Sequence, residues 1–218
     1  MLKAVVFDLD GVITDSAGYH FEAWSKIAEK LGIPFDLEYN EKLKGVSRIE
    51  SLNLILDNGP GRDSMSEEKK TEIATEKNEI YKELIKNITP SDLLPGILNC
   101  LIGCKEEGLK VALASVSKNA PFIIERLGVG GYFDYIADAN KIARSKPFPD
   151  IFLDCVGALG FKPDECIGVE DAQAGIEAIK AAGMKAVGVG SPESMKEADE
   201  ILGSTAELSM EVFRKLIP

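Results

Sequence analysis

The sequence has little of what nucleic-acid-binding, membrane-spanning and zinc-binding proteins require. Its 218 residues carry 36 acidic and 25 basic side chains, and the formal net charge of -11 argues against nucleic acid or an anionic membrane surface as a partner. No apolar run approaches the roughly 18 residues that cross a bilayer. His20 is the single histidine, and no histidine adjoins the acidic pairs described below, which excludes most zinc sites.

Cysteines are few and do not have the spacing of a metal site. Cys100 and Cys104 stand one helical turn apart, which could mark a ligand pair, but there is no second pair and no histidine nearby. We therefore expect all four cysteines, Cys155 and Cys166 included, to be buried free thiols. Free thiols indicate a reducing compartment, and the first strand leaves no room for a signal peptide, so we expect a cytoplasmic protein.

The most informative segment of the chain is its beginning. An apolar strand over residues 3–7 is followed by Asp8, Asp10 and Gly11. Side chains alternate along a strand, so the two carboxylates are expected to point the same way from its last positions. Open α/β sheets bind ligands at that edge, and two crowded carboxylates repel each other unless a cation or a proton lies between them. An ordinary polar turn is the alternative interpretation.

The chain divides into a helical stretch and an alternating stretch. Residues 15–89 have the periodicity of helices and show no strand pattern. After residue 90, short apolar strands alternate with helices, which predicts a parallel sheet covered on both faces. We therefore predict an α/β core domain, residues 1–14 and 90–218, with a helical domain, residues 15–89, inserted after the first strand. The helices expected in the insertion cover 19–31, 40–43, 48–56 and 67–85, and the later strands cover 109–114, 135–137, 166–169 and 185–189.

Three more polar segments follow strands or begin helices. Ser115 to Asn119 offers hydroxyls and free backbone amides, which suit an anion but also an ordinary helix cap. Lys146 stands between Ser145 and Pro147 in a proline-rich loop, where it could pair with an anion or simply face solvent. Glu170-Asp171 is a second acidic pair, which could serve a helix dipole or, with the first pair, supply the oxygen ligands that suit Mg²⁺.

Taken in order, these segments resemble the motifs of a known family. Asp8-x-Asp10, Ser115, Lys146 and Glu170-Asp171 are similar to the four motifs of the haloacid dehalogenase superfamily, spread over nearly the whole chain. The resemblance implies a Rossmann-like α/β core, and the helical insertion resembles the C1-type cap of that superfamily. The dehalogenase branch lacks the second aspartate, so its presence at position 10 points to phosphoryl transfer.

Within the superfamily, one branch is especially similar. Residues 8–16, His20, Trp24 and residues 43–48 resemble the mutases that interconvert β-D-glucose 1-phosphate and glucose 6-phosphate through β-glucose 1,6-bisphosphate. The alternative is a Mg²⁺-dependent phosphatase of small sugar phosphates with the same fold. Residues 44–48 favour the mutase, because a plain phosphatase has no need of them. A catalytically silent sugar-phosphate-binding protein is a third alternative, which the retained acidic residues disfavour. We expect a monomer.

The resemblance also implies catalytic roles. Asp8 would be the nucleophile that carries the phosphoryl group as an aspartyl phosphate, and Asp10 would be the general acid and base. Asp8, the backbone carbonyl of Asp10, Glu170 and Asp171 would hold Mg²⁺. The phosphoryl group in transfer would be neutralised by Ser115 and Lys146.

Substrate-binding roles follow from the same resemblance. Arg48 would hold the second phosphate, because its planar guanidinium can bind two oxygens at once. Two departures from the usual pattern are Ser16, where threonine is common, and Val116, where a smaller residue is common. Valine should be tolerated if position 116 contributes only its backbone N–H, whereas substrate affinity should suffer if space there is tight. The other expected substrate contacts are Ser115, Ser117, Lys118, Asn119 and Lys146 around the phosphates, with His20, Trp24, Lys44, Gly45, Val46, Ser47 and Lys77 on the sugar side.

Overall fold

The computed structural model describes residues 1–43 and 46–217. The chain forms two compact units, one made of Met1–Asp15 with Ile88–Pro218 and the other of Ser16–Asn87. We call the first the α/β unit and the second the helical unit. The prediction placed the two junctions after residues 14 and 89. Each unit has its own core.

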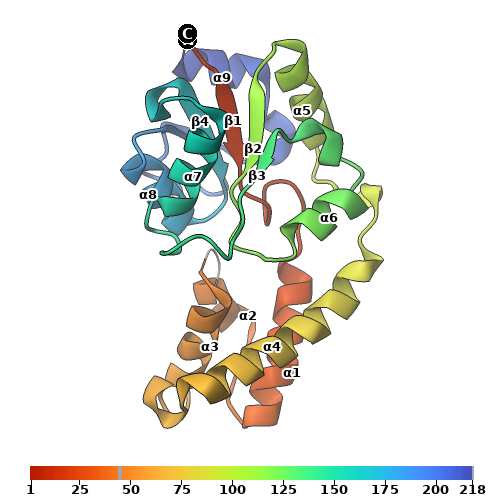
Figure 1. The fold of residues 1–218 in the computed structure, drawn as a ribbon, viewed down its shortest axis with the longest axis vertical. Coiled ribbons are helices and arrows are strands. Elements are labelled where there is room, and N and C mark those ends of the chain that lie inside the picture. Colours follow the sequence, from red (N-terminus) through yellow and green to blue (C-terminus); the bar gives the residue numbers. More distant parts are fainter. Residues whose placement is uncertain (44–45, 218) are drawn as a thin grey trace. The chain divides into compact units, whose positions relative to one another are not determined.

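The α/β unit is built on a six-stranded sheet whose paired strands are all parallel (Figure 1). The spatial order is β3-β2-β1-β4-β5-β6, so β1 lies between β2 and β4. This arrangement confirms the predicted Rossmann-like α/β fold. The last strand, at one edge of the sheet, was not predicted. The strands are β1 (Ala4–Phe7), β2 (Lys110–Leu113), β3 (Tyr135–Ile136), β4 (Cys166–Glu170), β5 (Lys185–Val189) and β6 (Glu200–Leu202).

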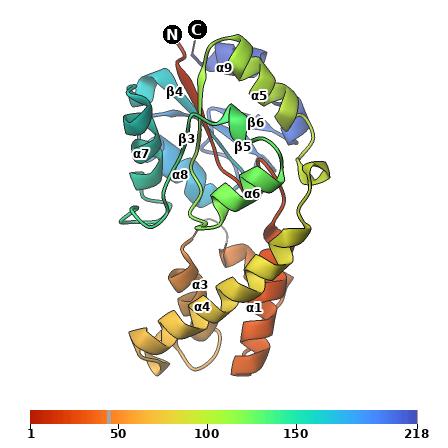
Figure 2. The ribbon, with the colours of Figure 1, turned by 45° about the vertical axis from the view of Figure 1, so that its right-hand side comes forward.

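Helices cover both faces of this sheet (Figure 1). α7 (Asp150–Leu159) and α8 (Gln173–Ala181) pack on one face, where their side chains share a core cluster with Val6 and Ala112. α5 (Ile97–Glu106) lies on the opposite face beside α9 (Met210–Leu216), as Figure 2 shows. Because both faces are covered, β1 is completely buried and its sequence is continuously apolar. The remaining elements of this unit are α6 (Ala120–Arg126) and the 3₁₀ turns Pro90–Asp92, Gly130–Tyr132, Pro163–Glu165 and Thr205–Glu207.

All regular elements described within the helical unit are helices. α1 (Ala17–Leu31) and α3 (Arg48–Asp57) both pack against α4 (Glu67–Leu84), and the core between them contains Trp24 and Leu52. The segment expected as one helix over 40–43 is instead α2 (Leu37–Asn40) followed by the 3₁₀ turn Glu41–Leu43, because the Asp36 side chain caps an earlier start. The other 3₁₀ turns are Arg62–Ser64 and Ile85–Asn87.

Two expectations about the whole chain can be compared with the structure. All four cysteines are buried and free, as predicted. Among the described residues, no helix combines the length and the apolar character that a membrane span requires.

Candidate active site

Three carboxylates meet at the carboxyl ends of β1 and β4. Asp8 follows β1, Glu170 ends β4 and Asp171 comes next, and each offers an oxygen within 4.8 Å of the others. The chain crosses from one side of β1 to the other between β3 and β4, so this is the topological switch point where open α/β sheets bind ligands. Neighbouring strands thus bring together residues that are far apart in sequence.

The alternation argument placed Asp8 and Asp10 at the last positions of the strand, but both lie beyond its end. β1 ends at Phe7, and the Asp8 N–H still donates to the Val169 carbonyl at 3.0 Å. Asp10 lies in the turn that follows, in which the Gly11 N–H donates to the Thr14 carbonyl at 2.8 Å. Gly11 has a φ of 77°, a backbone conformation that favours glycine, so the chain turns immediately after the second aspartate.

Lys146 connects two of the carboxylates. Its Nζ lies 2.5 Å from Asp8 Oδ1 and 2.6 Å from Glu170 Oε1, and the side chain is buried. Burial disfavours the charged amine, but the two carboxylates outweigh this effect and raise the pKa of Lys146 above its ordinary value. The alternative of a surface lysine is therefore wrong, because this ammonium group is a fixed charge inside the acidic cluster.

One lysine does not balance the negative charge at this edge. Burial raises the pKa of Asp8, Lys146 lowers it, and the neighbouring Glu170 and Asp10 raise it, and together these effects bring it to about 7. A carboxylate with so high a pKa lies where the nearby positive charge does not balance the negative charge. The donors that come together are carboxylate oxygens, which suit a hard divalent cation such as Mg²⁺. The residues present therefore fit a cation of that class.

The backbone around Glu170 fixes its orientation. Its Oε2 accepts the Ala172 N–H at 2.7 Å, while its Oε1 accepts Lys146. Gly175, on α8, leaves room for this carboxylate, because a Cβ at position 175 would come within 1.9 Å of Oε1. The sequence did not single out either Ala172 or Gly175. The available signal for Gly175 was a glycine in the first turn of the helix that follows the acidic pair Glu170-Asp171.

Ser115 lies two residues after the end of β2, and its side chain contacts the backbone that follows. The buried Ser115 Oγ accepts the Ser117 N–H at 3.1 Å, and the Ser117 Oγ accepts the Asn119 N–H at 3.3 Å. Asn119 makes no side-chain cap for α6. The Val116 side chain packs against the core cluster, which accommodates the larger residue at this position. Lys118 is exposed.

In the helical unit, three of the predicted residues lie together. Lys77 Nζ is 2.7 Å from His20 Nδ1 and 5.0 Å from the centroid of the Trp24 ring. Tyr81, which the sequence analysis missed, stacks on His20 with ring centroids 4.1 Å apart, and its hydroxyl is 2.8 Å from Ser16 Oγ. Tyr81 stands one helical turn after Lys77, and this spacing was a signal for its place on the same face.

The electrostatics of this group keep the imidazole neutral. Burial lowers the pKa of His20 well below its ordinary value, and the positive charges of Lys77 and Arg48 lower it further. Trp24 and Lys77 are both 2% exposed, and Trp24 belongs to the core of the helical unit.

Three more predicted residues of the helical unit, Val46, Ser47 and Arg48, lie at the start of α3. Arg48 is the first residue of that helix, and it is partly buried. The Ser47 Oγ accepts the Glu50 N–H at 3.3 Å, so this hydroxyl caps the helix. Val46 is partly buried, whereas Lys44 and Gly45 lie outside the described residues.

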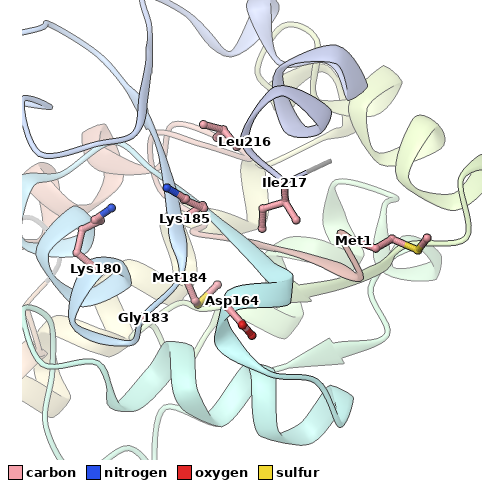
Figure 3. A pocket seen from close by; sticks show the side chains of 8 residues that line it. All are labelled: Met1, Asp164, Lys180, Gly183, Met184, Lys185, Leu216 and Ile217. Atoms are coloured by element: carbon pink, nitrogen blue, oxygen red, sulfur yellow. The ribbon is translucent and has the colours of Figure 1, made fainter.

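A separate cavity of about 470 Å³ lies at the opposite end of the strands (Figure 3). Asp164, which precedes β4, and Lys185, which begins β5, both line it together with Ile217. None of the predicted site residues lines this cavity.

Comparison with known proteins agrees with this fold. Residues 2–183 match the haloacid dehalogenase-like hydrolase family, and the chain belongs to that family. The family resemblance seen in the motifs is thereby confirmed.

Within the family, the chain is 49% identical to the β-phosphoglucomutase of Bacillus subtilis strain 168 over 98% of this chain and 95% of that protein. A crystal structure of β-phosphoglucomutase from Clostridium difficile is also 49% identical, with a TM-score of 0.97 over 99% of this chain and 97% of that one. A phosphorylated carbohydrates phosphatase of Thermotoga maritima is 30% identical over 85% of this chain and 84% of that protein.

Proposed function

We propose that this protein is a mutase that interconverts β-D-glucose 1-phosphate and glucose 6-phosphate, the reaction of a β-phosphoglucomutase. The observation that carries the proposal is the 49% identity to such an enzyme over 98% of the chain. The buried Asp8–Lys146–Glu170 arrangement supports it, because it supplies a carboxylate beside a fixed positive charge. The free, buried cysteines support a cytoplasmic location.

In this proposal Asp8 is the nucleophile. One of its oxygens attacks the phosphorus of β-glucose 1,6-bisphosphate, the bond from phosphorus to the sugar oxygen breaks, and an aspartyl phosphate forms. Asp10 gives a proton to the departing sugar oxygen, and later takes one from the hydroxyl that attacks the aspartyl phosphate. The phosphoryl group thus moves between the two ends of the sugar without being lost to water.

Positive charge and hydrogen-bond donors surround the transferring group. Lys146 and Ser115 neutralise its oxygens, whose charge is spread in the transition state. Mg²⁺ would be held by Asp8, the Asp10 carbonyl, Glu170 and Asp171, and would supply further charge neutralisation there. The donors present fit this ion, as the clustering of Asp8, Glu170 and Asp171 supports.

The other substrate contacts remain as the resemblance implies. Arg48 holds the phosphate that is not reacting, together with Ser117, Lys118, Asn119 and the backbone N–H of Val116. His20, Trp24, Lys77 and residues 44–47 contact the sugar. The contacts of His20, Trp24 and Lys77 with one another support a shared role for these three side chains.

A phosphatase of small sugar phosphates is the second candidate, favoured by the 30% identity to the Thermotoga maritima phosphatase. The two functions differ in where the phosphoryl group goes. The deciding experiment follows β- and α-glucose 1-phosphate by phosphorus NMR, with Mg²⁺ and a trace of β-glucose 1,6-bisphosphate as primer. A mutase forms glucose 6-phosphate from the β anomer alone, with little inorganic phosphate. Inorganic phosphate as the main product would instead establish the phosphatase.

A further inference from the structure

The loop that carries Lys146 is closed by an ion pair between its two ends. Arg144 Nη2 donates to Asp150 Oδ1 at 2.7 Å, and Arg144 Nε donates to Asp150 Oδ2 at 3.1 Å. The Arg144 backbone N–H donates to the same Oδ2 at 3.2 Å. The carboxylate therefore binds both the guanidinium and the backbone of Arg144, a bidentate geometry that fixes orientation as well as distance.

Contacts inside the loop add to this closure. The Arg144 guanidinium lies over the Phe148 ring, 4.5 Å from its centroid. The Phe148 N–H donates to the Ser145 carbonyl at 3.1 Å, which forms a turn around Lys146. Ser145 and Phe148, on either side of Lys146, are thus joined by a hydrogen bond, and Phe148 also contacts Arg144.

The far end of the loop is attached to a rigid part of the molecule. Asp150 is the first residue of α7, and the next two residues, Ile151 and Phe152, are completely buried in the core cluster. The Phe152 ring also lies 5.2 Å from the Nζ of Lys146. A contact with Asp150 therefore fixes Arg144 relative to the sheet.

We infer that Arg144 is a positioning residue that, through Asp150, holds Lys146 against Asp8 and Glu170. The lysine side chain is long and flexible, so the position of its Nζ depends on where the loop holds its backbone. This inference rests on the proposed function in one respect, which is that Lys146 neutralises the phosphoryl group during its transfer. Exposed ion pairs add little to global stability, and the Arg144 side chain is 57% exposed, so the effect is expected in the loop and not in the fold.

The variant Arg144→Ala tests this inference by two readouts. The first is acetylation of Lys146 by acetic anhydride, quantified by mass spectrometry, which needs no activity. Lys146 is protected in the wild type and becomes several-fold more reactive when the loop opens. The second is turnover, because a small displacement of a catalytic group is costly. We expect kcat to fall about tenfold for both the mutase reaction and acetyl phosphate hydrolysis, with KM little changed.

The chain offers a closely matched control. Arg62 contacts Asp57 with the same three groups, since its backbone N–H, Nε and Nη2 lie 3.0, 2.9 and 2.5 Å from the carboxylate oxygens. That pair belongs to the helical unit and is also exposed. Arg62→Ala should change neither the acetylation of Lys146 nor turnover. Equal effects of the two substitutions would show a general loss of stability and overturn the inference.

A double-variant cycle separates positioning from a structural role. In a Lys146→Ala background, Arg144→Ala should have almost no further effect on kcat, because the group that it positions is gone. Arg144→Lys should fall between the wild type and Arg144→Ala, because an ammonium cannot make the bidentate contact. Additive losses in the cycle, or unchanged acetylation of Lys146, would contradict the inference. A wild type that forms no glucose 6-phosphate would instead contradict the proposed function, and the acetylation result would still decide on Arg144.

Discussion

Gly175 lies directly against the carboxylate of Glu170, and a Cβ at position 175 would come within 1.9 Å of its Cδ. Gly175→Ala should therefore push this carboxylate away from Lys146 and from the two neighbouring aspartates. We expect the affinity for Mg²⁺ to fall at least about tenfold, since substitutions that misorient a metal ligand have effects of that order. Isothermal titration with MgCl₂ measures the change.

The control for this prediction is Gly157→Ala. Gly157 is also helical, on α7, but a Cβ there would meet nothing within 4 Å. The substitution should leave Mg²⁺ affinity unchanged and raise the free energy of unfolding by up to about 1 kcal/mol, because alanine favours helices. If both variants bound Mg²⁺ like the wild type, Gly175 would not be needed to place Glu170.

Asp8→Asn should abolish both mutase and phosphatase activity while the protein stays folded. The amide cannot accept the phosphoryl group, so no aspartyl phosphate forms. Burial and neighbouring carboxylates raise the pKa of Asp8 to about 7, so a neutral amide is well tolerated at this place in the metal-free protein. Turnover assays and thermal unfolding check the two parts. Turnover near the wild-type rate would show that Asp8 is not the nucleophile.

Asp10→Asn should separate catalysis from metal binding. Its proposed ligand atom is the backbone carbonyl, which the substitution leaves in place, so Mg²⁺ affinity should be retained. Turnover should fall by about 10²-fold or more, the scale of general acid–base catalysis. Titration of Mg²⁺ and steady-state kinetics on the same preparation measure both quantities. Loss of Mg²⁺ binding in parallel with activity would make the Asp10 side chain the ligand.

The neutral His20 predicts a pH dependence of stability. Its pKa in the folded protein lies well below the ordinary value of 6.5, so below pH 6.5 the unfolded chain binds a proton that the folded chain does not. The free energy of unfolding should therefore fall as the pH drops below 6.5, with a slope of up to about 1.4 kcal/mol per pH unit from this residue. Urea unfolding between pH 5 and 7 measures it.

His20→Gln should remove this contribution and leave that of the carboxylates, which both proteins share. The free energy of unfolding of the variant should then change less between pH 7 and pH 5 than that of the wild type. Identical pH dependence in the two proteins would mean that the imidazole takes up its proton as easily in the folded state as in the unfolded one.

Much of the fold was predictable because the strands are continuously apolar. β1, β4 and β5 are buried runs of this kind, bounded by turn residues. β6, by contrast, has only three residues, Glu200 among them, and it lies at the sheet edge beside β5. Such a short and partly polar segment has no pattern of its own, and its pairing with β5 decides its structure.

The site was predictable in its residues but not in its contacts. The acidic pairs at strand ends indicated where charge would gather, because parallel strands end at one edge. The contacts of Lys146 with Asp8 and Glu170 connect residues 138 and 24 positions apart, so no local pattern contains them. Tyr81 was missed because an aromatic residue on a helix face is most often part of the core. Here its hydroxyl contacts Ser16 and its ring stacks on His20.

Arg48 separates the two candidate functions. A bisphosphate intermediate carries phosphates at opposite ends, so one must be held while the other reacts. A small phosphatase substrate has no second phosphate. Arg48 begins α3, and burial lowers the pKa of its guanidinium while Glu79 and Tyr81 raise it. The group nevertheless remains charged at neutral pH, as arginines do, and its planar donors suit a phosphate.

Arg48→Ala should therefore impair the mutase reaction far more than hydrolysis of acetyl phosphate. A hydrogen bond to a charged group contributes roughly 1.5–3 kcal/mol, which corresponds to a loss of about 10- to 150-fold in kcat/KM for β-glucose 1-phosphate. Hydrolysis of acetyl phosphate should change less than about twofold, since it needs only the catalytic groups of the α/β unit. Arg62→Ala, an arginine substitution elsewhere in the helical unit, should alter neither reaction. If Arg48→Ala slowed both reactions equally, or neither, Arg48 would not hold the second phosphate, and the phosphatase would become the better-supported function.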